Sequence, residues 1–149
     1  MRTIAISSIR IKASIHDVFD FVVNMENYKQ WFPGVIDIKS HNDLPHGAIG
    51  KTYNEMVKIP FIGKKETIIE VMKAEGNKQF ITAANLPPLW PQMHISFSKN
   101  QNHTTRLTCT FNSRSKNRFF ILLFLPFIKQ EMQARANAGV LHLKKILEQ

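Results

Sequence analysis

The chain has 149 residues, of which 44% are hydrophobic, so it is long enough to bury one core without disulfides or bound metal, and we expect one domain over residues 1–149. It contains a single cysteine, which excludes an intramolecular disulfide and favours a reducing compartment. No apolar run reaches the ~18 residues of a membrane span, and the first residues lack the apolar core of a signal peptide, so the sequence predicts a soluble, cytoplasmic protein.

The formal net charge is +9, which raises the expectation of an anionic partner such as nucleic acid, phospholipid or an acidic ligand. The basic residues are spread along the chain, with doublets only at Lys64-Lys65 and Lys144-Lys145, and no nucleic-acid-binding motif accompanies them. We therefore interpret most of this charge as solvated surface and expect no nucleic-acid partner.

The first predicted elements are a strand and two short helices. Residues 3–12 have the pattern of a strand, and a change of phase near Ser7 is typical of a β-bulge. Ser14 is a good N-cap for a helix with an apolar face, and Asn24 is a second cap, for a short helix over residues 25–32 that a Pro-Gly pair ends.

Six further strands are predicted, each closed by a turn signal at a spacing of roughly ten residues. They cover residues 35–40, 51–59, 65–74, 78–84, 93–98 and 106–111, with turns that include 42–47, 60–63 and 75–77. The last two strands alternate most cleanly between apolar and polar residues, which is typical of an antiparallel sheet covered on one face only.

A long amphipathic helix is predicted from about Pro126 to the C-terminus, because a proline fits the first turn of a helix and would end or kink one begun upstream. Its apolar stripe consists of Ile128, Met132, Ala136, Gly139, Val140, Leu143 and Leu147. The predicted fold is therefore α+β: a seven-stranded curved antiparallel sheet, two short helices after strand one, and the C-terminal helix over the concave face. One helix rarely fills such a concavity, so we expect a cavity between helix and sheet.

Several segments resemble the START/Bet v 1-like (SRPBCC) superfamily, and within it the bacterial polyketide cyclase/dehydrase and lipid-transport-like group. The resemblance is carried by residues 11–22 (IKASIHDVFDFV), 25–35 (MENYKQWFPGV), 47–53 (GAIGKTY) and the closing helix, and it covers essentially the whole chain. It implies the helix-grip fold and a pocket for a hydrophobic molecule. It does not choose among lipid and sterol carriers, plant ligand-binding proteins, hormone receptors, aromatase/cyclases and ring-hydroxylase domains.

Glu55 is the acidic residue of most interest. If Tyr53 and Val57 point inward on their strand, Glu55 points inward with them, where a carboxylate must be paired, hydrated or protonated. It would then anchor a polar group of a ligand or act as a general acid/base, unless it forms a salt bridge or the strand faces the other way. The same argument applies, with less support, to Glu70.

The predicted ligand-binding residues are mainly large apolar side chains expected near the cavity. They are Trp31, Tyr53, Glu55, Trp90, Met93, Ile95, Phe97, Phe111, Phe127, Met132 and Gly139. Trp90 is included because it lies in an apolar, proline-rich loop, where a large apolar group needs a partner, and we expect it at the mouth or in the lining of the cavity. Gly139 costs about 1 kcal/mol relative to alanine in a helix, which indicates either room for a ligand or close packing on the sheet.

No metal site, cofactor or catalytic residue is predicted. The six histidines form no recognised ligand motif, and the alternation around Cys109 indicates a buried, inert thiol rather than a nucleophile.

Residues 119–128 contain no polar side chain and follow three basic residues, Arg114, Lys116 and Arg118. Basic residues beside bulky apolar ones are typical of peripheral membrane contact, here through residues 119–127. The alternative is that this segment lines the cavity, and both roles are compatible in a carrier that opens at a membrane.

The function predicted first is binding, and by extension transport, of a small hydrophobic ligand such as a lipid, isoprenoid or polycyclic compound. The alternative is a polyketide aromatase/cyclase or dehydrase-type enzyme that uses the same pocket, with Glu55 or Tyr53 moving protons. A third hypothesis is that the protein has a regulatory or partner-binding function, including an antitoxin-like or quinone-chaperone role.

Overall fold

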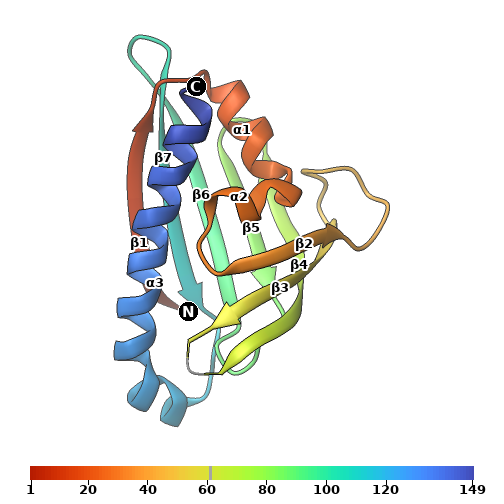
Figure 1. Cartoon of the computed structure of the whole chain (residues 1–149), viewed down its shortest axis with the longest axis vertical. Coiled ribbons are helices and arrows are strands. Elements are labelled where there is room, and N and C mark those ends of the chain that lie inside the picture. Colours follow the sequence, from red (N-terminus) through yellow and green to blue (C-terminus); the bar gives the residue numbers. More distant parts are fainter. Residues whose placement is uncertain (61) are drawn as a thin grey trace.

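The computed structural model describes residues 1–60 and 62–149 (Figure 1). The predicted turn at 60–63 therefore includes Phe61, which lies outside the described residues. In chain order the elements are β1 (Arg2–Ile11), α1 (Ile15–Val23), a 3-10 turn η1 (Met25–Asn27), α2 (Tyr28–Trp31), β2 (Val35–Ser40), β3 (Thr52–Ile59), β4 (Gly63–Glu75), β5 (Gln79–Ala84), β6 (Pro91–Asn100), β7 (Thr104–Ser113) and α3 (Arg118–Leu147).

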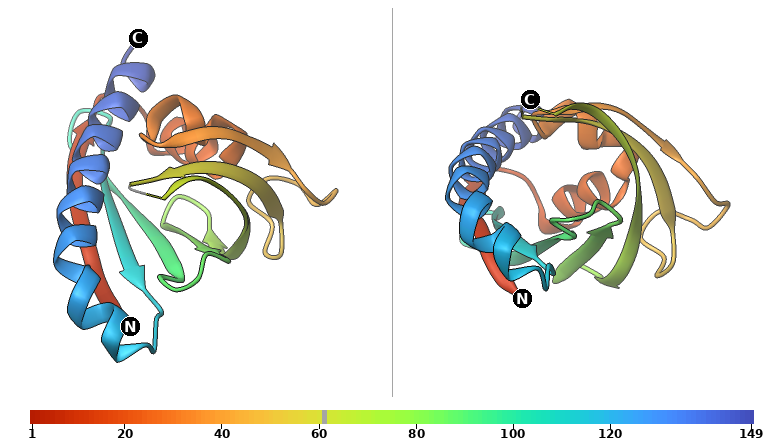
Figure 2. Two further views of the ribbon diagram at one scale, coloured as in Figure 1. Left: turned by 60° about the horizontal axis from the view of Figure 1, so that its bottom comes forward. Right: turned by 90° about the horizontal axis from the view of Figure 1, so that it is seen from below.

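The strands of the described chain form one seven-stranded antiparallel sheet in the order β1-β7-β6-β5-β4-β3-β2, which confirms the predicted α+β fold. Consecutive strands pair from β2 to β7, and β1 joins β7, so β1 and β2 lie at opposite edges. The sheet curls strongly, and in the view from below it bends round toward α3 and the short helices (Figure 2). The concave face therefore points into the molecule.

The two predicted helix caps are present after β1. The Ser14 hydroxyl accepts a hydrogen bond from the backbone N–H of Asp17 at 3.2 Å, and the Asn24 side chain accepts one from the N–H of Glu26 at 3.1 Å. The second helix, predicted over residues 25–32, is a 3-10 turn followed by one turn of α-helix.

The predicted bulge at Ser7 was misplaced. Pairing of β1 with β7 is regular from Ala5 to Ile11, and the register shifts instead between Thr3 and Ala5. Ile4 and Ala5 are both buried although they are neighbours, so the change of phase begins at these two residues rather than at the serines.

The predicted start of the closing helix was also wrong. The helix α3 begins at Arg118, where the Asn117 side chain accepts a hydrogen bond from the N–H of Phe120 at 3.1 Å, and Pro126 lies inside it. Pro126 removes one backbone donor, and Figure 1 shows the first turns of α3 set at an angle to the rest. The cap at Asn117 and the burial of Leu125 offset this cost, and neither could be read from the helical period.

Polar side chains of α3 cover the free edge of β1. The Gln133 amide donates to the Ile6 carbonyl at 2.7 Å and accepts from the Ile6 N–H at 3.1 Å. Farther along, Lys144 Nζ donates to the Arg10 carbonyl at 2.8 Å, and Glu148 accepts from the Lys12 N–H at 2.8 Å. An exposed strand edge is a template for aggregation, so these bonds both hold α3 in place and protect the sheet.

The helix α3 packs closely against α2 as well as against β1. At Gly139 an added Cβ would lie 3.1 Å from Cδ1 of Phe32 and 3.4 Å from the carbonyl oxygen of Trp31. Gly139 therefore permits close packing on α2, rather than on the sheet or beside a ligand. Within the described ranges, no helix is at once long enough and apolar enough to cross a membrane.

Candidate functional site

A cavity of about 870 Å³ lies between the concave face of the sheet, the first half of α3 and the loop from β5 to β6. Its wall is mostly apolar and includes Val57, Ile59, Ile69, Met93, Phe111, Phe120, Phe124, Ile128 and Met132. Several wall residues are also exposed on the surface, among them Ile62, Pro87, Pro88, Phe124 and Phe127. The cavity therefore opens between the β3–β4 turn, the β5–β6 loop and the start of α3.

Strand β3 supplies the buried acidic group of the wall, Glu55. Along β3 the side chains alternate, so that Glu55, Val57 and Ile59 line the cavity while Asn54 lies on the outer face. Glu55 is 5% exposed, and burial raises the pKa of its carboxyl group from 4.5 to about 7, although the positive charge of Arg135 opposes the shift.

The Glu55 carboxyl group forms no hydrogen bond or ion pair with any residue of the ranges 1–60 and 62–149. Arg135, whose positive charge acts on Glu55, is engaged elsewhere: its Nε donates to Glu131 at 3.0 Å and its Nη2 donates to the Lys58 carbonyl at 2.9 Å. The guanidinium also packs over Gly34, where any Cβ would lie 2.8 Å from Cζ of Arg135. Within the described chain, the buried Glu55 carboxylate is therefore not part of a salt bridge, which was the alternative to a role in ligand binding.

Tyr28 is the second polar group at this end of the cavity. Its pKa is raised well above the usual value, first by burial and then by the negative charge of Glu55. Thr82, on β5, belongs to the same wall. The cavity thus combines an apolar wall with a small polar end, the usual composition of a site for a small molecule.

Some predicted ligand-binding residues lie in this wall and others do not. The structure brings Glu55, Met93, Phe111, Phe127 and Met132 together around the cavity. It places Trp31, Tyr53, Ile95, Phe97 and Gly139 in the packed core outside the wall.

This division follows from how far the short helices extend over the sheet. On β6 the inward side chains run from Met93 in the cavity to Phe97, whose ring packs against Phe19 of α1 with centroids 5.1 Å apart. On β3 the Tyr53 ring is fully buried, its hydroxyl is hydrogen-bonded to Nδ1 of His46 at 2.6 Å, and burial raises its pKa to about 12. The concave face is therefore filled under α1 and hollow at the other end.

Trp90 and Glu70 also lie outside the wall. Trp90 is 37% exposed with φ +51°, and the Arg114 guanidinium lies 6.0 Å from the centre of its ring. The neighbouring residues 86–89 line the cavity instead. Glu70 is exposed on β4, at a position that alternates with the buried Ile69 and Val71.

Sequence reasoning missed Tyr28, Thr82 and Arg135. Arg135 follows Ile128 and Met132 at helical spacing, so that pattern could have placed it on the cavity side of α3. Tyr28 gave no such signal, because its direction depends on the single turn of α2.

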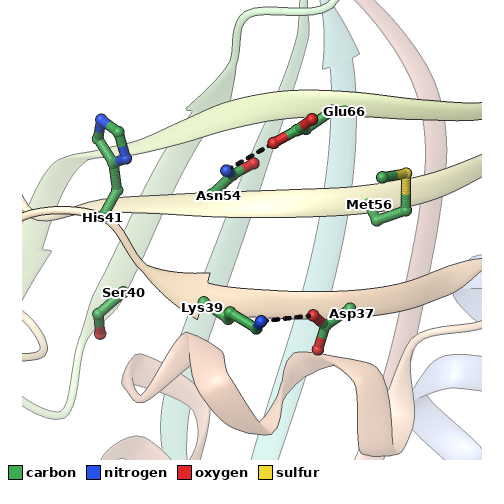
Figure 3. A pocket seen from close by; sticks show the side chains of 7 residues that line it. All are labelled: Asp37, Lys39, Ser40, His41, Asn54, Met56 and Glu66. Atoms are coloured by element: carbon green, nitrogen blue, oxygen red, sulfur yellow. Dashed lines mark hydrogen bonds and ion pairs between the residues drawn. The ribbon is translucent and has the colours of Figure 1, made fainter.

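A smaller, polar depression of about 360 Å³ lies on the outer face of β2, β3 and β4 (Figure 3). Its polar side chains pair with one another: Asn54 donates to Glu66 at 2.7 Å, and Lys39 Nζ lies 3.7 Å from an Asp37 oxygen. This mutual pairing is typical of a solvated surface. Over the described ranges, His, Cys, Asp and Glu side chains nowhere gather in groups of three that could hold a metal ion. Burial raises the pKa of the Cys109 thiol to about 12, as fits an inert core residue.

No protein-family model matches the sequence, and no curated protein matches it. Solved structures do match. A START superfamily protein from Mycobacterium smegmatis aligns with a TM-score of 0.79 at 15% identity, over 99% of this chain and 98% of that one. The Aha1 dimer protein from Colwellia psychrerythraea aligns with a TM-score of 0.64 at 20% identity, over 99% and 97%.

A third similar structure is the di-domain ARO/CYC StfQ from the steffimycin biosynthetic pathway, with a TM-score of 0.74 at 12% identity. The match covers 99% of this chain and 51% of StfQ, so the chain spans about half of that di-domain protein. At these identities the comparisons establish the fold: the chain has the helix-grip fold of START-like (SRPBCC) proteins.

Proposed function

We propose that the protein binds a small hydrophobic molecule, such as a lipid, isoprenoid or polycyclic compound, in the cavity beneath the curved sheet. The observation that carries the proposal is the cavity itself, whose volume of about 870 Å³ lies within the usual range of ligand sites and whose wall is mostly apolar. Burial of apolar ligand surface at about 25 cal/mol per Å² supplies the affinity. Glu55, Tyr28 and Thr82 supply the groups that orient a polar substituent.

Transport is the natural extension of this proposal, because the cavity opens to the surface beside residues 119–127. A peripheral membrane contact through these residues would give an apolar molecule a path that avoids water.

Filling the cavity is expected to abolish binding. In Ala84→Trp/Met132→Trp, two indole rings replace smaller side chains of the wall, so affinity for the apolar fluorescent probe N-phenyl-1-naphthylamine is expected to fall at least about tenfold. Probe fluorescence measures the titration, and native mass spectrometry of the purified wild type is expected to reveal a copurified apolar compound. Met72→Trp, on an exposed position of β4, is the matched control. Unchanged probe affinity in the folded double variant would refute the proposal.

A second candidate function is a polyketide aromatase/cyclase or dehydrase-type reaction in the same cavity. The observation that favours it is Glu55, a buried carboxyl group in the wall with a pKa of about 7, which suits a general acid/base at neutral pH. Tyr28 is its partner candidate, because the Tyr53 hydroxyl lies outside the wall and is bonded to His46.

If the reaction occurs, Glu55→Gln is expected to lower turnover of a linear polyketide about 10²- to 10⁴-fold, because the glutamine can no longer exchange a proton. Chromatography of the aromatic product measures the rate, and N-phenyl-1-naphthylamine binding shows that the cavity is intact. Tyr53→Phe is the control and is expected to retain turnover. Full activity of Glu55→Gln would exclude Glu55 as the acid/base.

A further inference from the structure

Large apolar side chains stand exposed around the opening of the cavity. Ile62 at the β3–β4 turn and Phe119, Leu122, Leu123, Phe124 and Phe127 in the first half of α3 are between 53% and 80% exposed. We refer to these six residues as the apolar rim. A cluster of this kind is unusual on a protein that meets only water, and it indicates an interaction surface.

The helical part of the apolar rim is preformed. The Asn117 cap starts the helix, so Phe119, Leu122 and Leu123 fall at the three- and four-residue steps that share one face. Phe120 and Phe124 of the same turns line the cavity. This part of α3 is therefore apolar on two faces, one directed into the cavity and one directed to the surroundings.

The stretch of chain that holds the helical part of the apolar rim carries only positive charges up to Glu131. Between Glu75 and Glu131 the sequence contains no Asp or Glu. Lys116 and Arg118 precede the helical part of the rim, Lys129 follows it, and all three are exposed. At the β3–β4 turn, the exposed Lys64 and Lys65 follow Ile62, and the exposed Glu66 after them accepts a hydrogen bond from Asn54.

This combination favours a lipid surface over a second copy of the chain. A symmetric dimer through the apolar rim would place the same basic residues of both copies together, and like charges at an interface repel. A bilayer with anionic headgroups offers the opposite charge to the lysines and arginines and an apolar layer to the phenylalanines and leucines.

We infer that the apolar rim and its basic neighbours dock on an anionic phospholipid bilayer, so that the cavity opens directly onto the acyl chains. The inference rests on the proposed function, because docking serves to exchange the hydrophobic ligand with the bilayer. Phe119, Leu122 and Leu123 enter the interface, while Lys116 and Arg118 contact the headgroups.

Sedimentation with unilamellar vesicles tests the inference. Wild type is expected to bind vesicles of phosphatidylcholine mixed with phosphatidylglycerol, and to bind pure phosphatidylcholine, or the mixed vesicles at high salt, at least about fivefold less well. Leu122→Ser/Leu123→Ser is expected to lose at least about tenfold in partitioning, because two inserted side chains become polar. Lys116→Glu/Arg118→Glu is expected to lose a similar amount on the mixed vesicles.

Two matched controls locate the effect. Leu141→Ser changes an exposed leucine on the far half of α3, and Lys78→Glu/Lys99→Glu changes two exposed lysines elsewhere, so both are expected to bind vesicles like wild type. The inference is overturned if wild type does not bind the mixed vesicles, if the controls lose as much as the rim variants, or if light scattering shows a dimer that Leu122→Ser/Leu123→Ser dissociates.

The same variants separate this inference from the proposed function. Leu122 and Leu123 do not line the cavity, so the double serine variant is expected to bind N-phenyl-1-naphthylamine like wild type when no vesicles are present. A wild type that binds the probe but not the mixed vesicles would refute membrane docking alone. A wild type that binds vesicles but whose probe affinity survives the cavity-filling substitutions would refute the cavity proposal alone.

Discussion

Replacing Glu55 with glutamine is expected to stabilise the protein by about 3 kcal/mol at about pH 8 and by much less at about pH 5. Burial raises the pKa of the Glu55 carboxyl group from 4.5 to about 7, because the cavity wall solvates its charge poorly and Arg135 compensates only in part. The glutamine has a similar shape and carries no charge at any of these pH values. Urea unfolding of both proteins at the two pH values measures the difference.

The sign of this pH dependence follows from proton binding. Between about pH 4.5 and pH 7 the folded state keeps a proton on Glu55 that the unfolded state has lost, so the free energy of unfolding falls as the pH rises. Above about pH 7 the carboxyl group is ionised in both states, and the full free-energy cost of burying its charge lowers the stability of the folded state.

Glu70→Gln is the control for this experiment, because that carboxylate is exposed on the adjacent strand β4 and its replacement is expected to change stability by less than about 0.5 kcal/mol. A Glu55→Gln variant less stable than wild type at about pH 8 would show that the carboxylate has a stabilising partner, and would contradict the description of the cavity's polar end.

Trp31→Ala is expected to lower the free energy of unfolding by about 3–5 kcal/mol. The indole is 1% exposed and lies where α2, α3 and the sheet meet, with ring centroids 5.1 Å from Tyr28 and 5.9 Å from Phe32. Its removal leaves a cavity beneath Gly139 that the surrounding helices cannot close fully. Urea unfolding followed by far-ultraviolet circular dichroism measures the loss.

The second tryptophan of the chain provides the comparison. Trp90 is partly exposed in the β5–β6 loop, so Trp90→Ala is expected to cost less than about 1 kcal/mol. Because Trp31 lies outside the cavity wall, the milder Trp31→Phe is expected to bind N-phenyl-1-naphthylamine within about twofold of wild type. Equal losses of stability in the two alanine variants, or loss of probe binding in Trp31→Phe, would contradict these assignments.

Local sequence signals predicted the fold well where one interaction determines the structure. Side-chain caps at Ser14 and Asn24 mark the starts of helices, and strict alternation in β6 and β7 marks strands with one buried face. The helix-grip arrangement followed from these elements together with the family resemblance. The start of α3 could not be predicted in this way, because a proline at position 126 is compatible with either the first turn or the interior of a helix, and only tertiary packing decides between the two.

For the candidate site, the sequence predicted which side chains point to the concave face of the sheet, but not which part of that face is hollow. Alternation on β3 showed that Tyr53 and Glu55 point the same way, but not that Tyr53 lies under the packed end while Glu55 reaches the hollow end. That boundary depends on where α1 and α2 stop, which is a three-dimensional property. For the same reason the sequence identified Trp31 as a ligand contact, whereas it belongs to the core.

The bonds between Gln133, Lys144 and Glu148 and the edge of β1 limit how the molecule can exchange its contents. They fasten the long C-terminal part of α3 to the sheet, so that part cannot swing outward without baring a strand edge. Any motion of α3 that admits or releases a ligand is therefore confined to the part of the helix before Gln133, which lies beside the β3–β4 turn and the β5–β6 loop at the opening of the cavity.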